Sequence, residues 1–357
     1  MSGKRRLLFV GYEGFEHWTG HPLAEPVGRV DLYGEHASEG ERDRAGAHWP
    51  ESLRICQAYP DLDTAIALAR PDAAVVSVPG GAKTTVDAEA LLLARGVDVL
   101  AKKLRLGDYR DIERLRAASE AGPGRLFVGE HYRQLPQVEA LRQLLAAGKL
   151  GRIWSVTWRC RLPYEAYDWM RGYRHLALED LAYHHFGVLH DVLGFHAERL
   201  YAQSFEPPGS TAGTMTAASA LADTAEGYRL NYQLLWCSSQ KPFGYFGEAV
   251  FEGRQVTARL TDEGLEIYSD AGRKKRIDVG EVRYQGAWGP LIQWLDEGAG
   301  AFAGMTPLGG ASLFGAFEPV LGAISLAVRS AETGQACVRA WPEVSAGGTD
   351  RREGEQA

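Results

Sequence analysis

The sequence predicts an α/β protein in which a doubly wound parallel sheet is followed by an α+β domain with a large, mainly antiparallel open sheet. Residues 5–129 alternate short apolar runs with helical patterns, and this alternation is typical of a parallel sheet covered on both faces. From residue 152 onward, strand-like runs follow one another across Gly-containing turns, as in an antiparallel sheet. A chain of 357 residues is long enough for both domains.

The N-terminal elements follow from continuous apolar runs and from the helix-ending glycines between them. Because the carboxyl ends of parallel strands meet at one edge, we expect a ligand to bind there. Residues 1–129 are therefore assigned to a Rossmann-like domain. Its expected strands are 7–10, 30–33, 73–78, 97–101 and 126–129, and its expected helices are 84–95 and 109–121.

The remaining chain, residues 130–344, is assigned to the α+β domain, and the polar segment 345–357 to a disordered tail. A long apolar helix near 319–329 is expected to pack back on the first domain. The basic run Arg273–Arg276 is interpreted as a solvated turn. The other expected helices are 138–147 and 180–193, and the expected strands are 152–161, 199–205, 217–223, 228–237, 245–251, 255–261 and 264–268.

Composition excludes several classes of function. The net charge of −7 argues against nucleic acid or an anionic membrane as the main partner. No apolar run is long enough for a signal peptide or a membrane span. The four cysteines show neither redox-pair nor metal-ligand spacing. We therefore expect a cytoplasmic protein with no nucleic-acid, membrane or metal partner.

The segment LEDLAYHHFGVLHD, residues 178–191, carries the clearest chemical signal. On a helix, Asp180 and His184 lie four residues apart on one face. A carboxylate next to an imidazole fixes its tautomer and raises its basicity, which suits a general base near neutral pH. The alternative is a buried histidine that a neighbouring acid satisfies. The adjacent His185 points about 100° away and is expected to pack elsewhere.

Two further segments favour a chemical site over a buried structural histidine at position 184. VDVLAKKLRL places Lys103 at the end of an apolar strand, and VGEHYRQLP follows one helix later with Tyr132 and Arg133. In this order the three segments resemble the Gfo/Idh/MocA family of nicotinamide-dependent sugar and cyclitol oxidoreductases. That family has Glu-Lys-Pro at a strand end, then Asn-Tyr-Arg, then an Asp-x-Gly-x-His helix. The resemblance covers roughly residues 5 to 340.

The resemblance implies roles for particular residues. Lys103 and His184 would be the acid/base pair, with Asp180 orienting the histidine. The substrate would be a small polar molecule, and the open sheet face would join copies of the chain into a dimer or tetramer. The implied substrate-binding residues are Tyr132, Arg133, Arg171 and Tyr183.

The resemblance also implies NAD or NADP as cofactor. The implied contacts are Gly11, Gly14, Glu35, Pro79 and Lys103.

The glycine fingerprint of a dinucleotide site is incomplete, however, because Glu13 and Glu16 stand at the second and third glycine positions. Leu104 replaces the proline after the lysine, so we expect a trans peptide bond there. Gly187 stands where the family often has a second Asp.

Three functions remain open at this point. The first is an NAD(P)-dependent oxidoreductase of a sugar, cyclitol or related polar alcohol or ketone. The second is a non-redox enzyme on the same scaffold, catalysing an elimination, isomerisation or cyclisation. The third is a non-catalytic binding subunit. In each enzyme Lys103, not Lys102, is expected to face the cleft, because side chains alternate along a strand. Lys102 is expected to point to solvent or to an acid on the opposite side.

Overall fold

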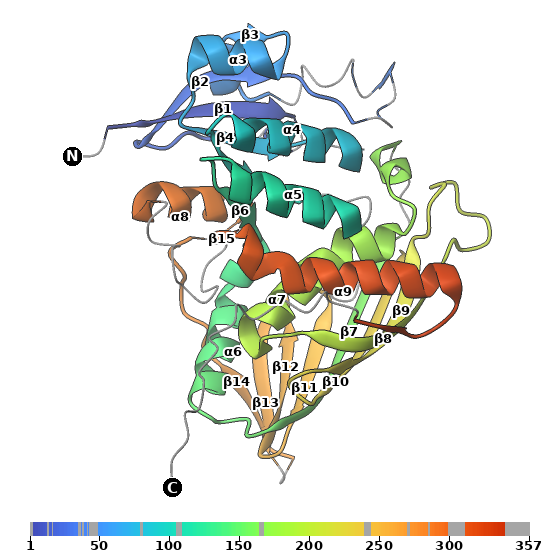
Figure 1. Cartoon of the computed structure of the whole chain (residues 1–357). Helices are drawn as coiled ribbons and strands as arrows, with labels where there is room; N and C mark the ends of the chain where they lie inside the picture. The colour runs from blue at the N-terminus through green and yellow to red at the C-terminus, as the bar shows by residue number, and fades with distance from the viewer. Residues whose placement is uncertain are drawn as a thin grey trace, which may run out of the picture.

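The structure is a computed structural model of the chain, and it contains two sheets with helices packed between and around them (Figure 1). It describes residues 3–12, 14–15, 17–34, 37, 39–40, 42, 49–78, 81–104, 109–163, 168–238, 244–269, 272–284, 286–298 and 311–339.

The first sheet has seven strands in the order β15-β6-β5-β4-β1-β2-β3. All its neighbours are parallel except β15, which pairs antiparallel with β6. The central strand β4 is buried along its whole length, as expected for a strand covered on both faces. The strands are β1 Arg5–Gly11, β2 Ala24–Val30, β3 Ala58–Tyr59, β4 Ala73–Ser77, β5 Asp98–Ala101, β6 Leu126–Gly129 and β15 Ala311–Leu313.

One face of this sheet is covered by helices α4 Ala82–Ala94 and α5 Tyr109–Ala121, with α3 Leu62–Ala69 beside them. The other face is covered by α8 Gly289–Glu297, by the short helix α2 Glu51–Arg54 and by the connection from β1 to β2. None of the described residues of that connection, 12–23, is helical. Instead, it contributes buried aromatic side chains. We call Phe9, Phe15, Trp18, Trp49 and Trp288 the aromatic cluster.

The second sheet has nine strands in the order β14-β13-β12-β11-β7-β10-β9-β8-β16. Its pairs are antiparallel except β7 with β10, so the predicted fold class is confirmed. The strands are β7 Ile153–Pro163, β8 Ala197–Phe205, β9 Ala217–Thr224, β10 Arg229–Ser238, β11 Glu248–Gly253, β12 Val256–Thr261, β13 Gly264–Ser269, β14 Lys274–Ile277 and β16 Cys337–Val338.

Three helices lie against the inner face of this sheet: α6 Pro136–Ala146, α7 Ala182–Leu193 and α9 Phe314–Thr333. Helix α9 runs between the two sheets and contacts α5 and β6 of the first one, as predicted for the 319–329 helix (Figure 1). One hydrophobic core continues from the α4/α5 face of the first sheet to the inner face of the second. No helix in the described part of the chain has the length and apolar character to cross a membrane.

Two predicted elements were wrong. The second strand ends at Val30 instead of running from 30 to 33, since Pro26 and Gly28 within it weaken the strand signal. Gly28 lies under the ring of Tyr59, where a Cβ would come within 2.4 Å. The basic run 273–276 is not simply a turn, because β14 pairs with β13 and Lys274 binds Glu266 across the pair. The predicted tail 345–357 lies outside the described residues.

Candidate active site

Lys103 follows β5 and reaches across to the helical segment before α7. Its Nζ lies 2.5 Å from Oδ1 of Asp180, and both side chains are largely buried, at 17% and 8% exposed. The peptide bond before Leu104 is trans, as predicted. The Leu104 N–H is held by the Tyr183 hydroxyl at 3.5 Å, so the backbone beside the lysine is tied to α7.

Lys102 points to the opposite face of the sheet, as predicted. Solvent or an acid was expected there, whereas the contacts described are a backbone carbonyl and an aromatic ring. Its Nζ donates to the carbonyl of Gly14 at 2.7 Å and lies 4.7 Å from the ring centre of Trp288. A Cβ on Gly14, whose φ is +68°, would come within 2.2 Å of that Nζ. Lys102 therefore joins the β1–β2 connection to the aromatic cluster.

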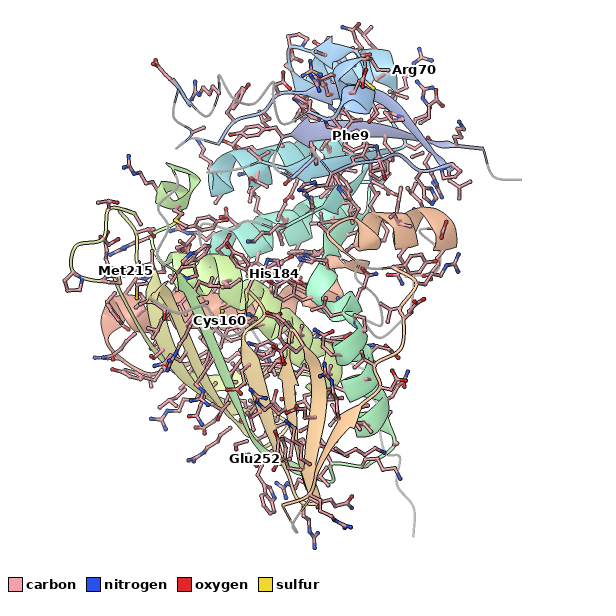
Figure 2. The ribbon with its side chains drawn as sticks, turned by 180° about the vertical axis from the view of Figure 1, so that it is seen from behind. Phe9, Arg70, Cys160, His184, Met215 and Glu252 are labelled. Atoms are coloured by element: carbon pink, nitrogen blue, oxygen red, sulfur yellow. The ribbon has the colours of Figure 1, made fainter. Side chains whose placement is uncertain are left out.

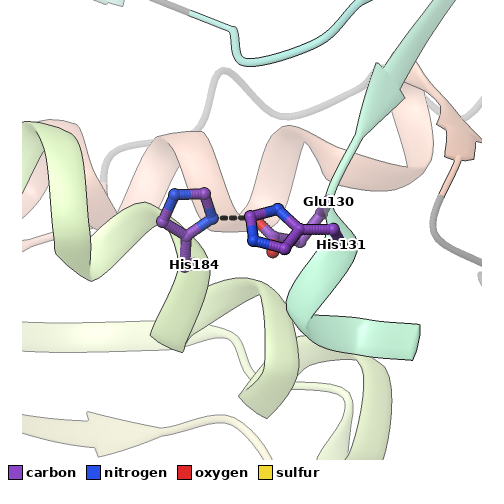
Figure 3. Close-up of side chains that lie close together, drawn as sticks. All are labelled: Glu130, His131 and His184. Atoms are coloured by element: carbon purple, nitrogen blue, oxygen red, sulfur yellow. Dashed lines mark hydrogen bonds and ion pairs between the residues drawn. The ribbon is translucent and has the colours of Figure 1, made fainter. Parts of the chain in front are cut away.

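His184 lies on the first turn of α7, between the two sheets (Figure 2). Its Nδ1 is 2.6 Å from Oε2 of Glu130, which follows directly after β6 (Figure 3). The ring stacks on Tyr132 at 4.7 Å, with an angle of 25° between the planes. Oε1 of Glu130 accepts the Tyr132 N–H at 2.8 Å, so the carboxylate is held by two donors.

Glu130 is fully buried, and burial alone would raise the pKa of its carboxyl group. The positive charge and hydrogen bond of His184, with smaller contributions from His131 and the Tyr132 N–H, outweigh burial and lower the Glu130 pKa to about 2. An ionised carboxylate against Nδ1 fixes the tautomer of His184 and leaves Nε2 for a substrate. Glu130 was not among the predicted site residues.

Gly187 makes room for Glu130. A Cβ at position 187 would come within 3.0 Å of Cγ of Glu130 and 3.4 Å of the Phe317 ring. An aspartate at this position, which the resemblance leads one to expect, would therefore press on the Glu130 side chain. The acid beside the histidine comes from the end of β6 and not from α7.

The expectation that Asp180 orients His184 was wrong, and local helix geometry explains why. Residues Ala177–Leu181 form a π-helical turn that leads into α7. In a π turn the hydrogen bonds run from i to i+5, so residues four apart across the junction no longer share one face as in a regular α-helix. Asp180 lies against Lys103, and Glu130 takes the place beside His184.

His131 completes the group around His184. Its ring lies edge-on to His184 at 5.3 Å and to Tyr132 at 4.8 Å. Burial lowers the His131 pKa to about 4, against the pull of Glu130, so this ring is neutral at neutral pH. One ligand atom from each of Glu130, His131 and His184 lies within 4.8 Å of the others, and this set could hold a metal ion.

The predicted substrate-binding residues differ in their surroundings. Tyr132 lies against His184, with the two rings stacked. Arg133 is buried and ion-paired with Asp191 at 3.0 Å, where it cannot line an open wall. Tyr183 is 1% exposed, and its hydroxyl donates to the Gly129 carbonyl, which is a structural role. Arg171 lies exposed on the 3-10 helix Asp168–Gly172.

His185 packs on another face of α7, as predicted. Its Nδ1 lies 2.8 Å from the Tyr232 hydroxyl and its Nε2 lies 3.1 Å from the Tyr245 carbonyl. Burial lowers its pKa to about 3, so this ring is neutral and structural.

The edge where a dinucleotide would bind differs from the usual doubly wound arrangement. Gly11, with φ +87°, is required because a Cβ would lie 2.0 Å from the Ser77 carbonyl of the next strand. Among the described residues of 12–23 no helix begins, so no helix N-terminus faces a pyrophosphate from this connection. The predicted contacts Glu35 and Pro79, and the replaced positions Glu13 and Glu16, lie outside the described residues.

The fold of this chain is similar to the folds of several solved oxidoreductases. No protein-family model and no curated protein matches the chain. An oxidoreductase from Agrobacterium radiobacter, solved with NAD+, L-tartaric acid and magnesium, is 17% identical over 94% of this chain and 98% of its own, with a TM-score of 0.73. The WlbA dehydrogenase from Bordetella pertussis, solved with NADH and UDP-GlcNAcA, is 17% identical over 95% of this chain and 100% of its own, with a TM-score of 0.71.

An inositol dehydrogenase homolog from Azotobacter vinelandii, solved with NADH and myo-inositol, is 17% identical over 95% of this chain and 98% of its own, with a TM-score of 0.71. These similarities span both sheets and nearly the whole of each protein. The chain therefore shares the fold of these oxidoreductases, with both of its sheets.

Proposed function

We propose that the protein is an NAD(P)-dependent oxidoreductase that interconverts a hydroxyl and a carbonyl group on a sugar, a cyclitol or a related polar molecule. The observation that carries the proposal is the pairing of two acid/base side chains with buried carboxylates, Lys103 with Asp180 and His184 with Glu130. Both pairs bridge a strand end of the first sheet and the α7 region. Solved structures of this fold contain NADH together with myo-inositol or UDP-GlcNAcA.

Each side chain has a part in this proposal. Lys103 or His184 Nε2 would take the proton from the substrate hydroxyl, and the partner carboxylates would hold these groups in place. Tyr132 and the exposed Arg171 would contact the polar groups of the substrate. A bound nicotinamide supplies the hydride exchange at the substrate carbon. The cofactor would lie against Gly11, Gly14, Glu35, Pro79 and Lys103.

A second candidate function is favoured by the β1–β2 connection. A non-redox enzyme would use the same two pairs for proton transfer alone, in an elimination, an isomerisation or a cyclisation. The observation behind it is that the described residues of 12–23 replace the usual crossover helix with the aromatic cluster and the Lys102–Gly14 contact. This arrangement takes away the helix N-terminus that normally binds the pyrophosphate.

Titration of NADH and NADPH against intrinsic tryptophan fluorescence decides between the two candidates, since the chain has nine tryptophans. The oxidoreductase proposal expects saturable quenching by at least one of them, followed by oxidation or reduction of a polyol or sugar acid. No binding of either nucleotide at millimolar concentration, together with turnover by cofactor-stripped protein, would instead establish the non-redox enzyme.

We also propose that the chain forms a homo-oligomer through the outer face of the nine-stranded sheet. Leu221 and Phe205 lie on that face and are 55% and 48% exposed. Light scattering coupled to size exclusion measures the mass in solution. Substituting Leu221 by Lys is expected to shift the mass toward the monomer, whereas an unchanged oligomer would place the interface elsewhere.

A further inference from the structure

The group formed by Glu130, His131 and His184 has the donor set of a transition-metal site. Two of the donors follow one another at the end of β6, and the third lies on α7, so two elements of the fold fix all three (Figure 3). Their ligand atoms lie within 4.8 Å of one another. A tetrahedral zinc ion with bonds of about 2.0–2.1 Å holds its ligand atoms roughly 3.3 Å apart. The donors are thus close to the spacing that an ion needs.

A hydrogen-bonded pair explains only two of the three residues. The contact between His184 Nδ1 and Glu130 Oε2 would be present in a simple acid–histidine pair. His131 is different, because neither of its ring nitrogens hydrogen-bonds to a described residue, and its half-buried ring lies beside the Glu130 carboxylate and His184. A neutral imidazole without a partner has a lone pair available for a metal. This third donor is what distinguishes the group from a plain pair.

The donor types also define the kind of ion. Two imidazoles and one carboxylate suit zinc and the later divalent transition metals, whereas magnesium and calcium prefer oxygen ligands throughout. Three protein ligands leave at least one position open for an exogenous oxygen, as in catalytic zinc sites. The neighbouring Lys103 would not repel the ion strongly, because Asp180 compensates its charge.

We propose that Glu130, His131 and His184 bind one divalent transition-metal ion of the zinc class, with an open position for a hydroxyl or carbonyl oxygen. The site does not depend on the reaction proposed above. In the metal-bound protein His184 is a ligand, and Lys103 with Asp180 remains as the pair for proton transfer.

Metal binding by tag-free protein tests the proposal without an activity assay. The protein is first stripped with a chelator and then titrated with Co²⁺, whose visible spectrum reports nitrogen and oxygen coordination, and with Zn²⁺ in competition with a chromophoric chelator. We expect one equivalent to bind, and His131→Ala to weaken binding by at least about tenfold, because losing even a group that hydrogen-bonds to a metal ligand costs roughly 10- to 100-fold. Glu130→Gln should weaken it similarly.

His196→Ala is the matched control, because His196 also pairs with a glutamate, Glu226 at 2.8 Å, but lies on β8 outside this group. It should leave the affinity unchanged. Circular dichroism and thermal unfolding of His131→Ala check that the fold is retained, and His131→Asn serves if it is not. Absence of binding to the wild type, or equal affinities of the wild type and the folded His131 variant, would overturn the metal site and leave the proposed reaction untouched.

Discussion

Lys102 and Lys103 are neighbours in the sequence but have opposite surroundings in the fold. Lys103 lies against the carboxylate of Asp180 on the α7 side, whereas Lys102 binds a backbone carbonyl and an aromatic face on the other side. Strand alternation predicts this divergence. The partners themselves could not be predicted, since Gly14 and Trp288 are 88 and 186 residues away from Lys102, and only the folded sheet brings them together.

The two lysines should therefore respond differently to substitution. Lys103→Met is expected to lower turnover by about 10²- to 10⁴-fold, the scale of general acid–base catalysis, with the fold retained. Lys102→Met should lose a hydrogen bond and a cation–π contact and reduce the free energy of unfolding by about 1–3 kcal/mol, with a smaller effect on turnover. Steady-state kinetics and denaturant unfolding of both variants measure the contrast, and equal losses of turnover would remove Lys103 from the mechanism.

Glu130 provides a test that needs no substrate. In the wild type the Glu130 carboxylate accepts a hydrogen bond from Nδ1–H of His184, so Nδ1 should carry the proton. Glu130→Gln keeps the shape but can present an NH₂ group to Nδ1, and the proton should then move to Nε2. Nitrogen-15 NMR of the imidazole reports the tautomer directly. An unchanged His184 spectrum would show that Glu130 does not set the tautomer.

At the scale of elements, α4 contains a feature that its sequence does not reveal. Glu89 is completely buried in this helix, and neither carboxylate oxygen has a hydrogen-bond partner among the described residues. Burial, reinforced by Asp111, raises the pKa of Glu89 well above its usual value and so favours the neutral, protonated form. A buried carboxyl group without partners destabilises the packing of α4.

Replacing Glu89 by Met should therefore stabilise the protein. Met has a similar length and needs no partner, so we expect the free energy of unfolding at pH 7 to rise by about 1–3 kcal/mol. Denaturant titration measures the change. Glu120→Met, on the exposed side of α5, is a control for the general effect of losing a glutamate. A loss of stability in Glu89→Met alone would mean that Glu89 has a partner and a role in the folded protein.

The helical segment with Asp180 and His184 shows where sequence reasoning reaches its limit. The apolar pattern correctly predicts a helix there, and the Asp-to-His spacing predicts a chemical site. A spacing of four residues implies a shared face only in a regular α-helix, and the π turn at 177–181 removes that condition. Pattern rules cannot detect a single wider turn, so the partner of each side chain had to come from the structure.

The alternation of strands and helices was enough to predict both sheets of the molecule, because apolar periodicity is a local property. Residues 109–121 and 126–129 form the expected helix and strand with the same bounds. Helix α8 and strand β15 could not be predicted in the same way. Each is short, and each is stabilised by contacts with strands of the first sheet, whose residues are far away in the sequence.

Stability of the whole molecule should depend on pH through Glu179. Its carboxylate accepts the His175 N–H at 2.6 Å, but burial raises its pKa to about 7. The folded state then binds more protons than the unfolded state between about pH 4.5 and 7, so stability falls as pH rises through this range. Because one pKa unit corresponds to about 1.4 kcal/mol, the rise from 4.5 to about 7 changes the free energy of unfolding by roughly 3 kcal/mol in total.

Glu179→Gln isolates this effect from that of other groups. The variant should match the wild type near pH 4 and become more stable than it by up to about 3 kcal/mol at pH 8, because the amide cannot ionise. Chemical denaturation at a series of pH values measures the difference. A constant difference across the range would mean that Glu179 does not titrate with a raised pKa.

The antiparallel strand β15 has a consequence for how the protein is made. It closes the edge of the first sheet at β6, yet it is formed by residues 311–313, near the end of the chain. Helix α8, which covers one face of that sheet, also comes late in the sequence, at Gly289–Glu297. During synthesis, the ribosome therefore releases β1 to β6 long before their edge and one face can be covered. A nascent chain stopped near residue 150 should have an open strand edge and exposed aromatic rings, and it should need a chaperone to stay unaggregated.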